Sequence, residues 1–189
     1  MFTIDDDGWL WPAAHCPSAN FNERPVDAVI DLLVIHNISL PAGQFGGDFV
    51  QRLFTNCLDC KAHPTFAELE DLRVSAHLLI DRHGRITQFV AFSQRAWHAG
   101  VSSFHGRENC NDFSIGIELE GADTVPYTEV QYQRLAAVTK TLQRRYPGIV
   151  PAHIVGHCEI APLRKTDPGP AFDWMRFRHL LTTAAAAAG

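Results

Sequence analysis

The distribution of hydrophobic residues along the chain predicts several β-strands. Ala28–His36 is apolar on both alternating faces apart from Asp31, a pattern typical of a central strand covered on both sides. Residues 74–81 and 85–92 are two further apolar runs that flank His83-Gly84, and together they predict a β-hairpin. The chain is therefore expected to contain a sheet with at least one buried central strand.

A further strand is predicted over Phe113–Glu120, where apolar and polar residues alternate without interruption. Alternate residues of a strand project to opposite faces, so this pattern gives one apolar and one polar face. The apolar face carries Phe113, Ile115, Ile117 and Leu119. The polar face carries Ser114, Gly116, Glu118 and Glu120.

Helical periodicity is clearest in Thr128–Tyr146. The segment begins with a capping box, in which Thr128 and Gln131 satisfy the first free backbone groups, and it stops at Pro147-Gly148. The apolar residues that recur at helical spacing are Leu135, Val138, Leu142 and Tyr146. One face of this helix is therefore expected to be buried.

Two more helices are predicted, one from about Phe172 into the alanine-rich tail and a shorter one over Asp48–Phe54. Residues 184–189 are expected to be a frayed helix end. Strands in the middle of the chain, with helices before, between and after them, predict an α/β (α+β) fold. We expect one domain, residues 1–189, with a mixed central β-sheet flanked by helices.

The composition is that of a globular protein, with 189 residues of which 46% are hydrophobic and 20% charged. A formal net charge of −5 without any lysine- or arginine-rich run argues against nucleic acid or an anionic membrane as partner. No segment approaches the roughly 20 apolar residues of a membrane span. The N-terminal segment lacks signal-peptide features, and five cysteines without a disulfide framework indicate reduced thiols. We expect a cytoplasmic monomer without an obligate protein partner.

Three residues are candidate metal ligands. His36 closes a buried apolar strand and His157 closes another, and strand ends at one sheet edge are common places for ligands. Asp167 follows His157 on the segment Gly156–Gly169, which prolines and glycines stiffen and which is predicted to be neither helix nor strand. Neutral imidazoles and a carboxylate suit a catalytic zinc, which takes three protein ligands and a water. The open alternative is that both histidines are core residues with ordinary hydrogen-bond partners.

Two charged residues could act beside such a metal. Glu118 projects from the polar face of its strand, and Gly116 two residues earlier leaves room for something close by. A carboxylate near a metal can be the general base for its water, although a solvent-facing glutamate is the simpler interpretation. Lys165 lies two residues before Asp167, where it could stabilise an oxyanion or be a solvated loop cation.

A competing metal site is offered by the sequence CLDCKAH, which places Cys57, Cys60 and His63 at a knuckle-like spacing without a fourth ligand nearby. Cys158 follows His157 directly, and adjacent strand residues face opposite ways, so the two are not expected to share an ion. No G-x-S-x-G motif occurs, which argues against a serine hydrolase. We expect one zinc ion per chain and none at the cysteines.

Five motifs, in order along the chain, resemble those of the AmpD-type anhydro-N-acetylmuramyl-L-alanine amidases. They are VIHNIS, RVSAHLLID, RAWHAGVS, NDFSIGIELEG and GHCEIAPLRKTDPGP. The likeness runs from about Gly8 to Arg178, nearly the whole chain. The family belongs to a larger amidase group that includes peptidoglycan recognition proteins and phage lysozyme amidases. The resemblance implies their fold, a mixed central sheet flanked by helices.

The resemblance also implies a zinc-dependent reaction. By position, the family's zinc ligands fall on His36, His157 and Asp167, its catalytic glutamate on Glu118 and its lysine on Lys165. The implied substrate is an anhydro-muropeptide, cleaved between the lactyl group of anhydro-N-acetylmuramic acid and L-alanine of the stem peptide. Such enzymes recycle cell-wall fragments in the bacterial cytoplasm and, in some species, limit the muropeptide signal that induces β-lactamase.

Substrate contacts implied by the resemblance are fewer. Asn37 is placed to hydrogen-bond the peptide, and Trp97 offers an aromatic face for the anhydro sugar. Arg73 matches an arginine that binds the stem-peptide carboxylate, a task that suits guanidinium geometry. Some relatives have a second arginine where this chain has Asn109, and Arg107 is the candidate substitute.

The rival function is a muropeptide-binding module without catalysis, as found in some recognition-protein relatives. Such modules lack a ligand or the acid/base residue, whereas this chain has all five positions. His77 is predicted to be structural or to orient a metal ligand by a hydrogen bond. The long segment Ser39–Pro64 is predicted to border the pocket as a lid, more mobile than the sheet when substrate is absent.

Overall fold

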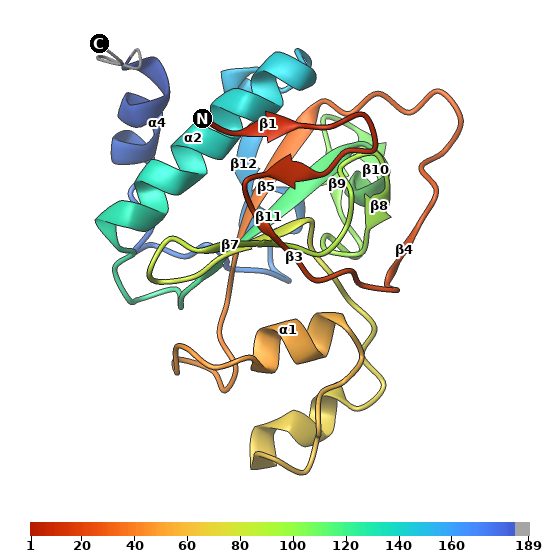
Figure 1. The fold of residues 1–189 in the computed structure, drawn as a ribbon, viewed down its shortest axis with the longest axis vertical. Helices are drawn as coiled ribbons and strands as arrows, with labels where there is room; N and C mark the ends of the chain where they lie inside the picture. The colour runs from red at the N-terminus through yellow and green to blue at the C-terminus, as the bar shows by residue number, and fades with distance from the viewer. Residues whose placement is uncertain (184–189) are drawn as a thin grey trace.

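A mixed six-stranded sheet, in the order β12-β5-β11-β6-β7-β3, lies at the centre of the protein (Figure 1). The computed structural model describes residues 1–183, so the expectation of a frayed end at 184–189 falls outside the described part. The strands are β3 (Ala14–His15), β5 (Leu32–Ile38), β6 (Leu78–Ile80), β7 (Ile86–Gln88), β11 (Ser114–Glu120) and β12 (Ile154–Gly156). β12, β5, β11 and β6 are parallel, and β7 is antiparallel to β6, which confirms the predicted mixed sheet and hairpin.

Short strand pairs and helices surround this sheet. The pairs are β1 (Thr3–Ile4) with β2 (Leu10–Trp11), β4 (Phe21–Asn22) with β8 (Arg95–Ala96), and β9 (Ser103–Phe104) with β10 (Arg107–Glu108). The α-helices are α1 (Phe49–Phe54), α2 (Glu129–Arg145), α3 (His157–Ile160) and α4 (Trp174–Thr182). The 3-10 helices are η1 (Pro64–Leu69), η2 (Cys110–Asp112) and η3 (Pro151–His153). No helix in the described part of the chain is long and apolar enough to cross a membrane.

The two faces of the sheet bury different sets of residues. Figure 1 shows α2 and α4 together on one side of the sheet, and α2 packs there on Ile115, Ile117 and Leu119 of β11. The residues that alternate with these on β11 face the other way, as the period of a strand requires. All seven residues of β11 are buried, so its polar face lies inside the protein and not in solvent.

Helix α2 starts where the capping box predicts. Thr128 accepts a hydrogen bond from the Gln131 N–H, and the Gln131 side chain accepts one from the Thr128 N–H. The same Gln131 side chain donates to the backbone oxygens of Ile80 and Glu120, at the ends of β6 and β11. One buried amide therefore ties the first turn of α2 to two strand ends. Helix α4 begins slightly later than predicted because Asp173 caps it through the Arg176 N–H.

Three predicted boundaries are wrong. The strand predicted from Ala28 begins at Leu32 and continues past His36 to Ile38, so His36 lies inside β5. Phe113 ends η2 and packs on the opposite side of the sheet from Ile115, because its backbone is not extended. The segment after Gly156 opens with the single turn α3 before the prolines begin, although neither helix nor strand was predicted there.

The segment between β5 and β6 forms a separate layer, which Figure 1 shows below the sheet. Its helix α1 agrees with the predicted Asp48–Phe54 helix, with Asp48 as the cap residue. Val50, Leu53 and Phe54 of α1 are buried against residues of β6, β8 and the chain after β7. The Gly46 N–H donates to the Glu120 carboxylate at 2.5 Å, so this segment is also tied to the end of β11.

Candidate metal centre and active site

Strand register brings the predicted site residues together. His36 of β5 lies directly opposite Glu118 of β11 in the parallel ladder. Gly156, the last residue of β12, pairs with Ile35 on the other side of β5, so His157 emerges beside His36. Three neighbouring strands thus supply His36, Glu118 and His157, although these residues are far apart in the sequence.

His36, His157 and Asp167 converge on one point. The two Nδ1 atoms of His36 and His157 are 3.0 Å apart. Asp167 Oδ2 lies 3.0 Å from His36 Nδ1 and 3.1 Å from His157 Nδ1. Both histidines are buried, with 1% and 3% of their surface exposed. These residues form a group whose ligand atoms all lie within 4.8 Å of one another.

The donor set suits a divalent metal ion. His157 Nε2 faces the Ala99 carbonyl oxygen at 3.1 Å, and a carbonyl can only accept, so Nε2 carries the ring proton. A neutral His157 then presents the lone pair of Nδ1 to Asp167 Oδ2. Ligands of a tetrahedral zinc at 2.0–2.1 Å lie about 3.3 Å apart, close to the observed triangle. Two nitrogens and a carboxylate oxygen are a common zinc donor set.

The protonation states favour cation binding. Burial lowers the pKa of His36 to about 4, so its imidazole is neutral near pH 7 and a ring lone pair is free. Burial alone would raise the pKa of the Asp167 carboxyl, but the His157 and His36 rings beside it hold that pKa well below its usual value. Asp167 is therefore ionised at neutral pH and supplies the negative charge of the site.

Glu118 lies beside this triangle without being part of it. Only 8% of the Glu118 surface is exposed, and its Oε2 atom is buried without a hydrogen-bond partner. Burial, followed by the nearby Asp167 charge, raises the pKa of Glu118 well above its ordinary value, while Lys165 opposes the shift. An unpartnered buried carboxyl oxygen with a raised pKa is the arrangement expected of a general acid/base.

All of these groups open into one cavity of about 300 Å³. Its polar lining residues are His36, Asn37, Ser75, His98, Glu118, His157, Lys165 and Asp167. Its apolar wall includes Leu40, Leu53, Phe54, Leu69, Leu72 and Val74, which come from the segment between β5 and β6. A His-His-Asp triangle that could hold a metal ion, a carboxyl and a lysine therefore line one partly open, largely apolar cavity.

Comparison with known proteins agrees with this geometry. Residues 25–170 match the family described as N-acetylmuramoyl-L-alanine amidase. The chain belongs to the N-acetylmuramoyl-L-alanine amidase family. The match covers the whole central sheet except β3, together with every residue of the metal triangle.

Individual relatives match over nearly the full length. This amidase is 60% identical over 177 residues to the 1,6-anhydro-N-acetylmuramyl-L-alanine amidase AmpD of Escherichia coli strain K12, which covers 94% of this chain and 96% of the relative. The crystal structure of a Se-Met AmpD derivative superposes with a TM-score of 0.92 at 60% identity, covering 95% of this chain and all of that one. The E. coli amidase AmiD, solved with the substrate anhydro-N-acetylmuramic acid-L-Ala-D-gamma-Glu-L-Lys, superposes at 0.57 with 29% identity, covering 94% of this chain and 65% of that one.

The remaining residues predicted to bind substrate in this amidase lie in different places. Asn37 and Trp97 both line the cavity. Asn37 donates to Asp123 Oδ1 at 2.9 Å, and Trp97 Nε1 donates to Asn22 Oδ1 at 2.7 Å, so both side chains are held in place. Lys165 reaches the cavity from an exposed turn.

Neither predicted arginine reaches the cavity. Arg73 is exposed between the cavity residues Leu72 and Val74, and its guanidinium donates to the Glu70 and Leu72 carbonyl oxygens. Arg107 pairs with Asp31 at 3.0 Å and stacks on Phe113 at 3.9 Å. Asp31 immediately precedes β5, whereas His36 lies toward its other end. The structure thus places Arg107 away from the site, because its charge is already paired elsewhere.

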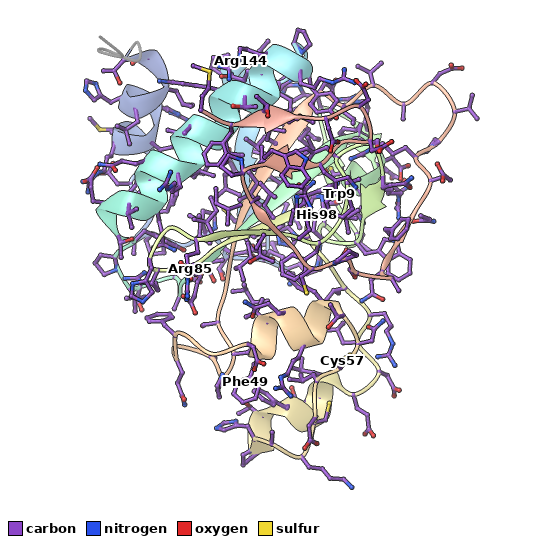
Figure 2. All side chains as sticks on the ribbon, in the orientation of Figure 1. Trp9, Phe49, Cys57, Arg85, His98 and Arg144 are labelled. Carbon is purple, nitrogen blue, oxygen red and sulfur yellow. The ribbon has the colours of Figure 1, made fainter. Side chains whose placement is uncertain are left out.

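His98 is a site residue that the sequence analysis missed. It is 9% exposed, and its Nδ1 lies 2.9 Å from Nε2 of His36. Figure 2 shows its side chain in the middle of the molecule, among the strands of the sheet. The glycine at position 116 was the sequence feature that could have indicated a close neighbour, because a Cβ there would lie 2.4 Å from His98 Cγ. The His98 ring fills the space beside Gly116.

His77 does not orient a metal ligand by a hydrogen bond. Its Nδ1 accepts from the Gly116 N–H at 3.0 Å, and its Nε2 faces the Gln94 carbonyl oxygen at 3.1 Å. Because Nδ1 accepts, the ring proton is on Nε2 and donates to Gln94. Of the two roles predicted for His77, structural or orienting a metal ligand, the structure supports the structural one. The contact with His36 is made by His98 instead.

The cysteine motif lies away from this centre. Cys57 is exposed near α1, and Figure 2 shows it far below His98. His63 Nδ1 lies 2.8 Å from the Thr65 hydroxyl and also accepts the Thr65 N–H, as the cap of η1. The prediction that Cys57, Cys60 and His63 hold no zinc stays a prediction.

Proposed function

We propose that His36, His157 and Asp167 hold one zinc ion, at which this amidase cleaves anhydro-muropeptides. The bond cleaved is the amide between the lactyl group of 1,6-anhydro-N-acetylmuramic acid and L-alanine of the stem peptide. One observation carries the proposal, namely the converging triangle of ligand atoms next to the unpartnered Glu118 carboxyl in a single cavity. The printed names of relatives at about 60% identity support the same substrate.

Zinc bound there would acidify a water molecule and polarise the scissile carbonyl. Glu118 is the residue of this chain that moves protons. Its free Oε2 accepts a proton from the attacking water, and its raised pKa lets it hold that proton near neutral pH. The same carboxyl then returns the proton to the departing amine of L-alanine, so the leaving group departs neutral.

Lys165 stabilises the developing negative charge on the carbonyl oxygen. Lys165 lines the cavity from the turn that precedes Asp167. A positive group in a partly enclosed site acts on the transition state more strongly than it would in water. Asn37 and Trp97 bind the peptide and the sugar respectively, and Arg73, just outside the cavity rim, is free to turn toward the stem-peptide carboxylate.

The proposal places the protein in the recycling of cell-wall fragments. As a monomer in the bacterial cytoplasm, it would act on muropeptides that have left the wall, and it would limit the fragments that induce β-lactamase in some species. The absence of a lysine- or arginine-rich run is consistent with a small, soluble fragment as substrate. This placement rests on the substrate proposed above.

Mass spectrometry of reaction products tests the function. Zinc-loaded protein is incubated with an anhydro-muropeptide, and free stem peptide together with anhydro-N-acetylmuramic acid is the expected result. Chelator-treated protein and Glu118→Gln are the matched controls. The first should leave the substrate intact, and the second should cleave it about 10²–10⁴-fold more slowly. Tight binding of muropeptide without cleavage by the zinc-loaded protein would establish the binding-module alternative instead.

A further inference from the structure

His98 contacts the proposed metal ligand His36 at the ring nitrogen that does not belong to the triangle. Its Nδ1 lies 2.9 Å from His36 Nε2, and its own Nε2 lies 3.1 Å from the Ser114 hydroxyl. His36 Nδ1, on the opposite side of its ring, belongs to the metal triangle. The three side chains thus form a line of hydrogen bonds that starts at the triangle and ends inside the sheet.

The positions of the protons along this line follow from the metal site. A ring nitrogen binds a metal only with a free lone pair, so His36 Nδ1 is unprotonated and the ring proton of His36 sits on Nε2. That proton can be donated only if His98 Nδ1 accepts it. A neutral His98 then has its own proton on Nε2, where the Ser114 hydroxyl accepts it.

We propose that His98 is a positioning residue for the metal centre, which holds His36 in the Nε2–H tautomer and fixes its ring orientation. The inference rests on the zinc site of the proposed function. Acceptors behind a metal-bound imidazole are a general means of fixing tautomer and ring orientation, and their loss commonly weakens metal affinity 10–100-fold. His98 also lines the cavity, but its hydrogen-bond contact within the triangle is with His36, so it is proposed to act through His36.

The backbone of His98 is fixed by Asn111. The Asn111 Oδ1 accepts the N–H groups of His98 and Ala99, at 3.1 and 2.8 Å. The carbonyl oxygen of Ala99 in turn accepts from His157 Nε2. Two consecutive residues therefore orient both histidine ligands, His98 through its ring and Ala99 through its carbonyl. Such a short segment can align two ligands only if its own position is rigid, and Asn111 provides that rigidity.

His77 is a natural comparator within the same chain. It is fully buried, it uses both ring nitrogens, and its ring centre lies 5.7 Å from that of His98. Yet its partners are Gly116, Gln94 and Arg24 and not a metal ligand. A general packing defect in this region should therefore arise from either histidine, whereas a defect in ligand orientation should arise from His98 alone.

Zinc affinity measured by competition with a chromogenic chelator tests the proposal in three variants. His98→Leu removes the acceptor and should bind zinc 10–100-fold more weakly. His98→Asn places an amide oxygen near the position of Nδ1 and should recover most of that loss. His77→Leu should destabilise the fold but keep the zinc affinity of the unaltered protein. Two results would attribute the effect to packing and overturn the proposal. One is an equal loss of zinc affinity in His98→Leu and His98→Asn, and the other is an equal loss in His98→Leu and His77→Leu.

Long-range 1H–15N spectra of the unaltered, zinc-loaded protein provide a second test, which needs no variant to fold. The expected result is a proton on Nε2 of both His36 and His98. A proton on Nδ1 of His98 would overturn the proposal. If the unaltered protein binds no zinc, the proposed function fails together with this role. If it binds zinc and His98→Leu binds it equally well, only the role of His98 fails.

Discussion

The two walls of the cavity are built on different principles. The polar wall comes largely from strands β5 and β11 and the turn after β12, whose positions are fixed by the register of a parallel ladder. The apolar wall comes from the segment between β5 and β6. It is held by the packing of α1 and by hydrogen bonds from the Ser18 and Asn20 side chains to the Phe54 carbonyl oxygen, from Asn20 to the Val74 carbonyl oxygen, and from the Gly46 N–H to Glu120. The polar wall carries the reactive groups, which need a fixed geometry. The apolar wall shapes the cavity, and a hydrophobic surface tolerates small adjustments.

The largest effect should follow from removing a ligand on the polar wall. His36→Ala or Asp167→Ala leaves two protein donors, fewer than the three usually found at a catalytic zinc. We expect bound zinc and measurable turnover to be lost together, as determined by metal analysis and by product formation. His83→Ala, in an exposed turn, is the control and should change neither. Full activity in a zinc-free His36→Ala protein would remove the metal from the proposed mechanism.

The next largest effect should come from substitution of Glu118, which should lower turnover without loss of the metal ion. Glu118→Gln should still bind one zinc ion and muropeptide, while its turnover falls about 10²–10⁴-fold through the loss of proton transfer. Turnover and metal content, measured on the same preparation, check this expectation. A Glu118→Gln protein with near-normal turnover would show that another group moves the proton.

The raised pKa of Glu118 should also be visible in stability. A carboxyl whose pKa is higher in the folded than in the unfolded protein destabilises the fold as pH rises above the unfolded value of about 4.3. Glutamine carries no charge, so metal-free Glu118→Gln should gain melting temperature relative to the unaltered protein between pH 4 and pH 8. Thermal unfolding in chelator across that range gives the comparison, and a difference independent of pH would contradict the assigned shift.

The apolar wall can be loosened through Glu120. Its carboxylate accepts the N–H groups of Gly46 and Arg82, so Glu120→Ala should lower the free energy of unfolding by about 1–3 kcal/mol. We expect faster amide exchange around Gly46 and weaker substrate binding, with most of the turnover rate retained. Glu68→Ala, at an exposed position on η1, is the control.

The same exchange experiment tests the lid prediction for Ser39–Pro64 in the unaltered protein. Backbone amides of residues 42–47 should exchange faster than those of β5 and β11 when substrate is absent. The buried side chains of α1 should give that helix intermediate protection. Uniform protection across the segment and the sheet would show that the apolar wall is as rigid as the polar wall.

The smallest effect is expected at the cysteine motif. Cys57→Ser should leave one zinc ion per chain and unchanged turnover, because no part of the proposed mechanism uses this exposed thiol. Metal analysis that finds two zinc ions per chain, one of them lost in Cys57→Ser, would establish the knuckle site that we do not expect.

Much of the polar wall could be predicted because it depends on local patterns. A buried apolar run fixes β5, strict alternation fixes β11, and strand ends at one edge suggest where His36 and His157 meet. The ends of the elements were less certain, because Phe113 and Ala28 fit a strand pattern, but Phe113 caps η2 and Ala28 lies four residues before β5 begins. The alternation in β11 leaves open a solvent-facing Glu118, and only the tertiary fold shows that its polar face is buried.

The partners of individual side chains could not be predicted. His77 and His98 are both histidines in apolar surroundings, and the sequence does not show which one faces His36. Arg107 was a reasonable substitute at Asn109 until its pairing with Asp31 was known. Such contacts join residues tens of positions apart, so they depend on the packing of strands and not on the spacing of motifs.

The parallel register also determines when in folding the metal centre can exist. His36 is separated from His157 by 121 positions and from Asp167 by 131, and the ladder between β5 and β12 must form before these groups meet. Long-range parallel pairing is among the slower events in folding. We therefore expect an ion that needs all three donors to bind only after the sheet has formed, and to stabilise the folded protein by mass action once it is bound.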